Sequence, residues 1–382
     1  MTSRWRLVIH ALDRTGPPVL ARSFLRWLVV EHGDHTVDVV AFRGGELLDD
    51  FVRLSPVRVL LDPEEPWEWR RPDPDRISQL RARVRDLPPV DATLLISVAA
   101  GQALPFLPPN GAPIVTWVVE EGESYPYGVD SRTDRWLAGS EGTRLDVLDR
   151  IGRDVDVHVA PEFVEHPPHC SPALRQRCRT ALGAVGNELL VLGAGIATIR
   201  KAPDLFLEVA LAYRRAQNAR PAGDGTRAPA LRFVWLGGER DGLFHQVRDE
   251  SVRLGLDNVR FFGSVVDVSP WLAASDMFLH PARLDSFPNV CLHAALAGTP
   301  VVAFSGAGGV PEMLGADFCG SPYPDVVGLA GRLEELTHPT SRAELAERQQ
   351  RTVRQRYTAE VGAPVILEQM LAAVAAASPT AR

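Results

Sequence analysis

The sequence predicts an α/β protein built from two doubly wound domains, and three observations lead to this fold class. Short apolar runs rich in Val, Ile and Leu alternate with amphipathic stretches, which is the pattern of βαβ units and mostly parallel sheets. The alternation forms two series, separated by a Pro- and His-containing stretch from Ala160 to Pro172 that reads as a linker. The chain of 382 residues is also too long for one ordinary domain and suits two.

The first series predicts a domain over residues 1–165. Its expected strands are RLVIHAL, VDVVAF, TLLISV, PIVTWVV, RWLAG and VDVHVA, and a helix over VLARSFLRWLVVE joins the first two. The Pro-rich, charged stretch EEPWEWRRPDPDR is expected to be an insertion at the surface.

The second series predicts a domain over residues 185–357. Its expected strands are ELLVLGAG, LRFVWLGG, NVRFFG, DMFLHP and TPVVAF. Its expected helices are APDLFLEVALAYRRA, GLFHQVRDESVRLGL, VSPWLAAS, the segment from Pro288 to Ala297, and SRAELAERQQRTVRQRY. The Gly-, Ala- and Pro-rich segment from Ala219 to Ala230 is expected to be a flexible loop.

A last apolar helix is expected from Glu360 to Ala377, and no strand follows it. We therefore expect residues 360–382 to pack back on the first domain. Leu367 and Leu371 lie one turn apart on one helix face, so both are predicted to contact residues before Ala160.

Composition narrows the class of protein. Hydrophobic residues make up 45% of the chain and charged residues 23%, which are ordinary globular values. No apolar run approaches the roughly 20 residues of a membrane span, and the first residues pass directly into a strand pattern, so a cytoplasmic protein without an integral membrane segment is expected. The net charge of −7 argues against nonspecific nucleic-acid binding.

The sequence predicts no metal site. The four cysteines lack the spacing of zinc ligands and are expected to be reduced thiols. Of the two Asp-rich stretches, Asp73 to Asp75 falls in the Pro-rich surface loop, and Asp154 to Asp156 alternates like a strand whose acids face water.

One stretch, from Met277 to Phe304, has the features of an anion site. A strand ends, a polar loop follows, Ser286 is predicted to cap a helix with Pro288 in its first turn, and Gly298 ends that helix. The helix N-terminus then points its backbone N–H groups at the end of the sheet, where a diphosphate fits.

Two polar residues flank this predicted anion site. Asp285 lies in the loop before the helix, and His293 shares a helix face with Asn289, four residues earlier. The alternative is that Asp285 only helps to cap the helix and that His293 is a packing residue.

The run DSFPNVCLHAALAGTPVVAFSGAGGVPEML resembles the donor site of the retaining glycosyltransferases of family four, in which two acidic residues with seven residues between them flank a Phe-Pro or Phe-Gly turn. Asp285 stands at the first acidic position and His293 at the second. LGAGIATIRKAPDLFLEVA resembles the strand and helix around the family's phosphate-binding lysine, here Lys201, and IHALDRTGPPVLARSFL resembles the first strand, glycine loop and helix of its acceptor domain, with Gly16 in the loop.

The resemblance implies the GT-B fold, in which two Rossmann-like domains face a cleft. It also implies transfer of a hexosyl group from a nucleoside diphosphate sugar to an unidentified acceptor, with retention and with neither cofactor nor metal. Lys201 and the amides near Pro288 would then stabilise the leaving diphosphate, Asp285 would bind sugar hydroxyls, and Glu312 would face the donor. The donor-binding residues so implied are Gly16, Arg200, Gly263, Val265, Phe287, Pro288, Asn289, Val290, His293 and Glu312.

Two features depart from the family pattern in the second domain. A neutral imidazole has one acceptor atom, so His293 cannot accept hydrogen bonds from both ribose hydroxyls as a carboxylate does. Relatives also carry an arginine five or six residues before the lysine, where this chain has Gly195 and Ile196. Arg200 either compensates for that arginine or is a solvated surface residue.

A third departure lies in the first domain. Relatives present a histidine at the end of a central strand, where TWVVEEGESY offers Glu120, Glu121 and Glu123. Glu120 is therefore a catalytic candidate for orienting the transferred sugar or the acceptor, and the alternative is a solvated loop carboxylate. A silent sugar-nucleotide-binding subunit and a sugar-nucleotide epimerase of the same fold also stay open as functions.

Overall fold

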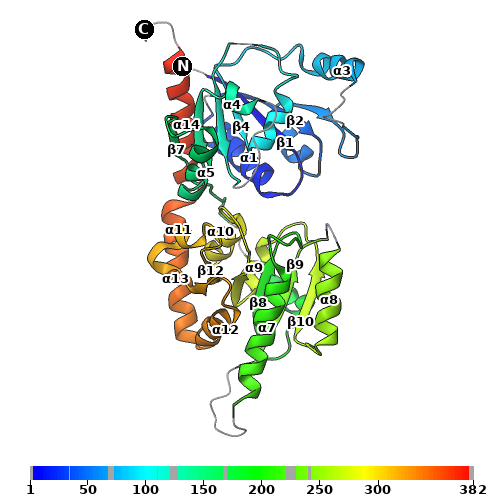
Figure 1. Cartoon of the computed structure of the whole chain (residues 1–382), viewed down its shortest axis with the longest axis vertical. Coiled ribbons are helices and arrows are strands. Elements are labelled where there is room, and N and C mark those ends of the chain that lie inside the picture. Colours follow the sequence, from blue (N-terminus) through cyan, green and yellow to red (C-terminus); the bar gives the residue numbers. More distant parts are fainter. Residues whose placement is uncertain are drawn as a thin grey trace. The chain divides into compact units, whose positions relative to one another are not determined.

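The computed structural model describes residues 3–33, 35–67, 73–109, 111–120, 128–166, 170–220, 229–239 and 242–377. The chain divides into two compact units. Unit 1 comprises Met1–Glu165 and Thr358–Arg382, and unit 2 comprises His166–Tyr357. Figure 1 shows that each unit is a sheet with helices packed on its faces. Glu121, Glu123, residues 68–72 of the predicted insertion and residues 221–228 of the predicted loop lie outside the described residues.

Unit 1 contains a seven-stranded parallel sheet in the order β3-β2-β1-β4-β5-β6-β7. Its strands are β1 (Arg4–Ala11), β2 (Thr36–Arg43), β3 (Val57–Leu61), β4 (Ala92–Ile96), β5 (Ile114–Val118), β6 (Arg135–Ala138) and β7 (Val157–Val159). Every residue of β4 is buried because both faces of the sheet are covered, so this strand reads as a continuous apolar run.

The helical segments of unit 1 are α1 (Gly16–Arg26), η1 (Trp27–Glu31), α2 (Leu48–Val52), α3 (Pro74–Val84), η2 (Val98–Ala103), α4 (Val129–Arg132), α5 (Glu141–Ile151) and α14 (Ala359–Ala377). One face of the sheet packs against α1 and α14, in a core that joins Leu7 to Phe24 and Ile366. The opposite face packs against α3 and η2, in a core that joins Val8 to Leu80. The unit therefore has the two covered faces of a Rossmann-like domain.

The last helix, α14, completes the first of these cores. Its buried face consists of Ala363, Ile366, Met370 and Ala373, spaced at three and four residues. Leu367 packs partly against this core, but 45% of Leu371 is exposed. Leu371 is not among the residues of this core, whose line along α14 passes through Met370.

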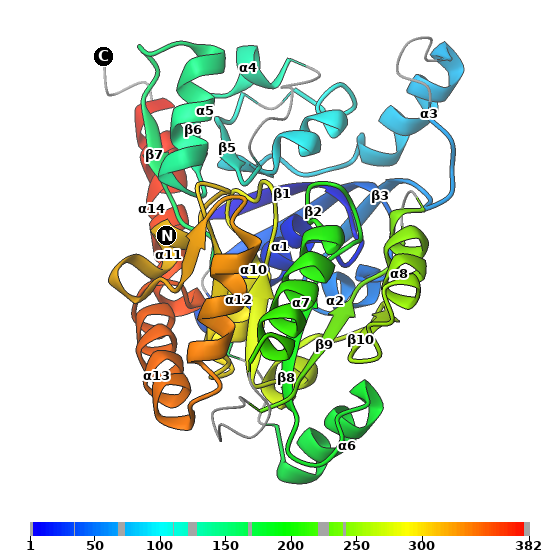
Figure 2. The same ribbon diagram turned by 60° about the horizontal axis from the view of Figure 1, so that its bottom comes forward.

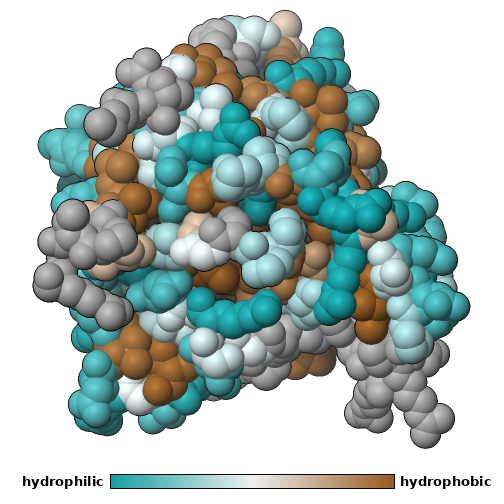
Figure 3. Space-filling model, turned by 90° about the horizontal axis from the view of Figure 1, so that it is seen from above, coloured by the Kyte–Doolittle hydropathy of each residue, from teal (hydrophilic) through white to brown (hydrophobic). Residues whose placement is uncertain are grey.

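Among the described residues, α14 is the one helix that is long and apolar enough to cross a membrane. Its packing in unit 1 accounts for that composition. On the face of the molecule seen in Figure 3, apolar residues form scattered groups among polar ones.

Unit 2 contains a six-stranded parallel sheet in the order β10-β9-β8-β11-β12-β13. Its strands are β8 (Leu189–Ala194), β9 (Leu231–Leu236), β10 (Val259–Gly263), β11 (Met277–His280), β12 (Val301–Ser305) and β13 (Gly320–Pro322). In both sheets the strand order reverses beside the first strand, between β1 and β4 and between β8 and β11. Doubly wound sheets bind ligands at such a reversal, outside the carboxyl ends of the strands.

The helical segments of unit 2 are α6 (Pro172–Leu182), α7 (Pro203–Asn218), α8 (Leu243–Arg253), α9 (Ser269–Ala274), α10 (Asn289–Leu296), α11 (Val310–Leu314), η3 (Gly315–Asp317), α12 (Val326–Glu335) and α13 (Pro339–Arg356). Helices α7 and α12 lie side by side on one face of the sheet (Figure 2). Unit 2 includes α6, which precedes the predicted start of the second domain at residue 185.

The two Asp-rich stretches differ from their predicted structures. Asp73 caps α3 and accepts a hydrogen bond from the Asp75 amide at 3.0 Å, so this stretch begins a helix rather than forming a loop. Asp154 and Asp156 precede β7 instead of alternating within it. Among the described residues, no group of three or more His, Cys, Asp or Glu side chains is placed to hold a metal ion. The four cysteines form no disulfide.

Candidate functional site

The candidate site lies at the strand-order reversal of unit 2, on the loops that follow β8, β11 and β12. Backbone hydrogen bonds tie these loops together. The Asp285 amide donates to the Ala307 carbonyl at 3.0 Å, the Gly309 amide donates to the Asp285 carbonyl at 2.9 Å, and the Arg283 amide donates to the Arg200 carbonyl at 2.9 Å. Residues far apart in the sequence are thereby held at one edge of the sheet.

Two glycines permit the close approach of the loops after β11 and β12. A Cβ atom on Gly308 would lie 1.9 Å from the Asp285 carbonyl oxygen, and one on Gly309 would lie 2.0 Å from the Ser286 carbonyl oxygen. Gly308 also has φ +133°, which side chains rarely allow. The position of Asp285 therefore depends on glycine in the neighbouring loop.

Asp285 is the centre of a buried charge cluster. It is 6% exposed, and its carboxylate accepts hydrogen bonds from Lys201 Nζ and, at 3.0 Å, from Arg200. His280, the last residue of β11, has its Nε2 atom 3.2 Å from the same carboxylate. Two cations and one imidazole thus surround one acid.

The surroundings keep Asp285 ionised. Burial would raise the pKa of Asp285, but the charges of Lys201 and Arg200 and the contact with His280 hold it well below its ordinary value. Burial lowers the pKa of His280, although Asp285 acts in the opposite direction. With His280 neutral, the cluster carries one net positive charge. The exposed part of Arg200, 52% of its side chain, presents that charge at the surface.

Local backbone structure positions Lys201. The Lys201 stem lies over Gly195, whose added Cβ atom would be 3.4 to 3.6 Å from the stem carbons. The next residue, Ala202, has the left-handed φ of +57° and leads into α7.

Lys201 is also the single lysine of the chain, since every other residue among the 41 Lys and Arg is arginine. This feature of the composition distinguishes Lys201 in the sequence alone.

Helix α10 begins one residue after Pro288, which is its N-cap residue. The predicted cap at Ser286 is therefore wrong: Ser286 is buried two residues earlier, where its carbonyl faces Gly309. The predicted end is confirmed, because Gly298 has φ +81° and the Thr299 amide donates to the Ala294 carbonyl at 2.9 Å.

The remaining predicted residues of unit 2 fall into two groups. Asn289, Val290 and His293 are half-buried on α10, and the exposed Glu312 lies on α11. Phe287, by contrast, is 4% exposed and packs edge-on against Tyr357, with ring centroids 5.5 Å apart. Phe287 therefore supports the loop from the core side.

Gly263 and Val265 lie at the end of β10, at the outer edge of the sheet. The Gly263 carbonyl accepts a hydrogen bond from the Gly237 amide at 2.8 Å, and Gly263 has φ +93°. In the sheet order, β10 is separated by β9 from β8, the strand that leads to Lys201.

Gly16 and Glu120 lie in unit 1. Gly16 is exposed at the start of α1, and Glu120 follows β5. Glu120 accepts hydrogen bonds from the Ser97 hydroxyl and, at 3.1 Å, from the Val119 amide. Glu120 is therefore a half-buried carboxylate that these two hydrogen bonds position.

Three residues that the sequence did not single out also lie at carboxyl ends of strands. His280 ends β11; Ser97, fully buried with the left-handed φ of +76°, follows β4; and His10 lies near the end of β1. The Nδ1 atom of His10 is buried and forms no hydrogen bond with any described residue. A polar residue at the end of an apolar strand was the available signal in each case.

Comparison with known proteins relates unit 2 to one family. Residues 187–338 match the family model described as "Glycosyl transferases group 1". A D-inositol 3-phosphate glycosyltransferase of Saccharomonospora viridis is 30% identical over 158 residues, which are 40% of this chain and 35% of the relative. The enzyme of that name from Mycobacterium tuberculosis H37Ra is 29% identical over 202 residues, 51% of this chain and 36% of the relative. The chain thus spans little more than a third of these relatives.

Solved structures extend the likeness to both units. Anabaena Alr3699/HepE in complex with UDP and glucose has a TM-score of 0.74 at 18% identity, covering 97% of this chain and 100% of that chain. A glycosyltransferase from Rickettsia africae has a TM-score of 0.74 at 14% identity, covering 97% and 99%. At such identity the likeness shows the fold, which is the pair of Rossmann-like domains of the GT-B class.

Proposed function

We propose that this chain is a retaining glycosyltransferase that moves a hexosyl group from a nucleoside diphosphate sugar to an acceptor. The observation that carries the proposal is the ionised, buried Asp285 held by Lys201 and Arg200 at the strand-order reversal of unit 2. These residues lie within the stretch that matches the glycosyltransferase family model. Such a cluster offers cations for a diphosphate and a carboxylate for sugar hydroxyls.

The cations act on the leaving group. As the bond from the anomeric carbon to the diphosphate breaks, the departing oxygen takes the electron pair and gains negative charge. Lys201 stabilises that charge, with the backbone amides of the first turn of α10. Arg200, adjacent to Lys201, supplies a second cation and so compensates for the arginine that relatives carry five or six residues before the lysine.

Asp285 binds the sugar. Its carboxylate accepts hydrogen bonds from sugar hydroxyls once Lys201 turns toward the diphosphate, and it is not assigned as a covalent nucleophile. In a retaining transfer the acceptor hydroxyl arrives on the face that the diphosphate leaves. The departing phosphate oxygen then lies beside that hydroxyl and takes its proton.

The other residues bind the nucleotide and the acceptor. His293 contacts the ribose or the diphosphate, Glu312 faces the donor, and backbone groups from Gly263 to Val265 contact the base. Glu120, positioned by Ser97, orients the transferred sugar or the acceptor. The reaction needs no metal because Lys201 and the helix N-terminus meet the charge, and we expect it to occur in the cytoplasm.

Structural neighbours and sequence relatives indicate which donor and which acceptor to test first. Complexes of Anabaena Alr3699/HepE with UDP and glucose and with UDP-glucose favour a uridine nucleotide as the first donor to test. D-inositol 3-phosphate, in the names of the curated relatives, is one acceptor to test.

A panel of UDP-, GDP- and dTDP-sugars tests the function, each assayed with and without candidate acceptors. Release of nucleoside diphosphate that depends on an acceptor, with a product of the donor's anomeric configuration by NMR, is the expected result. Binding without turnover indicates a silent subunit, and a donor altered without an acceptor indicates an epimerase. Either outcome contradicts the proposal.

A further inference from the structure

Unit 1 contains a cavity of about 720 Å³ that no residue of the proposed reaction lines. Its floor is a row of neighbours across three strands, because Arg6 of β1 pairs in register with Thr93 of β4, and Thr93 with Ile114 of β5. All three positions lie toward the amino-terminal ends of their strands. The cavity is therefore at the opposite end of the sheet from His10, Ser97 and Glu120.

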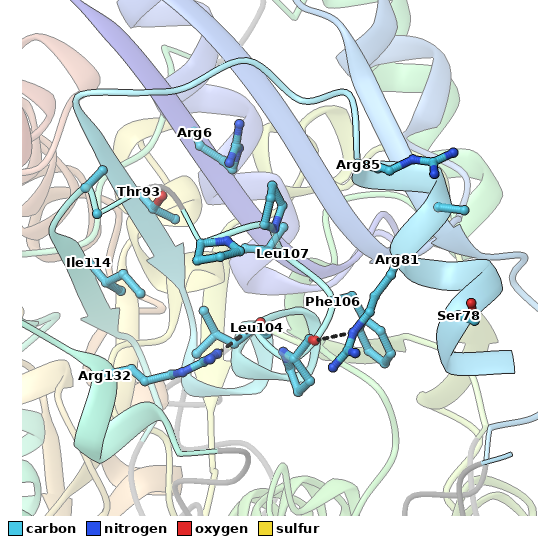
Figure 4. A pocket seen from close by; sticks show the side chains of 16 residues that line it. Arg6, Ser78, Arg81, Arg85, Thr93, Leu104, Phe106, Leu107, Ile114 and Arg132 are labelled. Carbon is cyan, nitrogen blue, oxygen red and sulfur yellow. Dashed lines mark hydrogen bonds between the residues drawn. The ribbon is translucent and has the colours of Figure 1, made fainter. Parts of the chain in front are cut away.

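Four arginines line the cavity (Figure 4), and none of the described residues that line it is acidic. Arg81 and Arg85 come from the end of α3, Arg132 comes from α4, and Arg6 lies at the floor. Arg6 is neutralised by Asp38, at 2.7 Å. The charge of the cavity therefore depends on the other three arginines.

Among the described residues, none of those three arginines has a carboxylate partner. Within the part of the chain that the structure describes, no Asp or Glu oxygen lies within 4.0 Å of the charged groups of Arg81, Arg85 or Arg132. Arginines elsewhere in the same unit are paired, as Arg144 is with Glu141 and Arg150 with Asp146. The cavity thus has an excess of positive charge that an anionic ligand would balance.

The structure holds two of these side chains in place. Arg81 Nε donates to the Pro105 carbonyl at 3.3 Å, and Arg132 donates to the Leu104 carbonyl at 3.0 Å. Figure 4 shows the two guanidinium groups approaching these adjacent carbonyls from opposite sides. Each bond uses one of the five N–H donors of a guanidinium and leaves the others available. The two planar groups are therefore already positioned to donate to phosphate oxygens.

Apolar side chains form the rest of the wall, including Leu104, Phe106, Leu107 and Ile114. An inorganic ion would leave this surface without contact, whereas an organic phosphate would cover it. The volume is within the ordinary range of small-molecule sites, about 300 to 1,000 Å³.

We propose that this cavity binds a small phosphorylated organic molecule through Arg81, Arg85 and Arg132. The site is separate from the donor cluster, which lies in the other unit. Along β1, the four residue steps from Arg6 to His10 span roughly 13 Å, so the cavity is also separate from the carboxyl ends of the strands of unit 1. The inference does not depend on the proposed transferase activity.

Calorimetric titration of the full chain with fructose 1,6-bisphosphate, and separately with inorganic pyrophosphate, tests the proposal. The Arg81→Gln/Arg85→Gln double variant should bind the bisphosphate at least about tenfold more weakly, since charge-assisted hydrogen bonds are lost. The matched control is Arg53→Gln/Arg153→Gln, which removes the same charge from exposed positions outside the cavity and should stay within about twofold of the wild type.

Two further variants and a vesicle-binding measurement complete the test. The Lys201→Ala protein should keep the cavity's affinity, so binding lost in that variant belongs to unit 2 and contradicts the proposal. Arg85→Gln alone removes no hydrogen bond that the structure shows, so this variant should fold. It should bind the bisphosphate more weakly than the wild type, and it replaces the double variant if that protein does not fold. Equal affinity in wild type and arginine variants overturns the proposal. So does arginine-dependent binding to phosphatidylglycerol vesicles without binding of either soluble probe, because that pattern indicates a membrane-contact surface.

Discussion

Lys201 and Asp285 form an ion pair in which only 18% and 9% of the two side chains are exposed. The pair joins a loop after β8 to a loop after β11, across 84 positions of sequence. In the proposed reaction Lys201 exchanges this carboxylate for a diphosphate.

Replacement of Lys201 by alanine should reduce turnover. Loss of one preorganised donor to a developing charge costs about 2.7 to 4 kcal/mol, or roughly 10²- to 10³-fold in kcat. Steady-state kinetics on the donor identified by the panel measures the change. Arg253→Ala, on α8 and paired with Glu250, is the control for loss of one cation from unit 2. An unchanged kcat with a raised KM would exclude the transition-state role.

Because Lys201 is the single lysine of the sequence, its ε-amino group is the one side-chain amine that an amine-reactive reagent can modify. UDP should slow the acetylation of Lys201 by acetic anhydride, since the diphosphate covers the amine. Uridine, which has no phosphate, should not. Mass spectrometry of the modified peptide follows the rate, and equal rates with and without UDP would contradict diphosphate contact.

The pKa of Asp285 predicts how stability depends on pH. Because folding lowers this pKa, the stabilisation is fully present above the unfolded value of about 3.9 and is lost as the pH falls toward the folded value. Asp285→Asn should therefore melt below the wild type at pH 7, and the difference should shrink below about pH 4. Asp249→Asn, at an exposed position on α8, should show little difference at either pH. A difference in Tm independent of pH would contradict the assignment.

His293→Ala should weaken the binding of UDP by roughly fivefold, the effect of losing one hydrogen bond of about 1 kcal/mol. His293→Glu should restore affinity, because a carboxylate offers two acceptors to the ribose hydroxyls. His245→Ala, on α8 with half of its side chain exposed, is the control. Calorimetry measures all three, and unchanged affinity in His293→Ala would remove this residue from the donor site.

Gly308→Ala should disturb the site through the backbone. The added Cβ would lie 1.9 Å from the Asp285 carbonyl at a φ of +133°, so the loop must shift. We expect a Tm several degrees lower and a loss of activity. Gly331→Ala, within α12 and with no atom within 4 Å of the added Cβ, should melt at the same or a higher temperature. Equal melting temperatures for both variants would show that the two loops do not need this contact.

The fold class could be predicted because buried parallel strands read as continuous apolar runs, as β4 and β8 do. The strands that the sequence did not indicate, β3 and β13, lie at the edges of their sheets, where burial is partial and the apolar pattern is weak. Helix α3 was not predicted because its Pro- and Asp-rich start resembles a loop.

The sequence singled out Lys201, Arg200 and Asp285 one by one, but their contacts with each other could not be predicted. Lys201 and Asp285 were each indicated by local motifs, and only folding brings them together. In the sequence, His280 is marked only as a polar residue at the end of an apolar strand, with no indication of its partner. Its contact with Asp285 depends on the path of the loop that Gly308 and Gly309 permit.

Helix α14 gives the chain an unusual order of assembly. Ile366 and Met370 belong to the same core as Leu7, yet the ribosome makes them only after the whole of unit 2. The amino-terminal sheet is thus synthesised first, with the part of its α1 face that α14 covers still open, and that part is closed only after unit 2 has been made. During synthesis unit 2 has all its residues before unit 1 does, so a chain truncated after residue 357 would contain the whole of unit 2 and an incomplete unit 1.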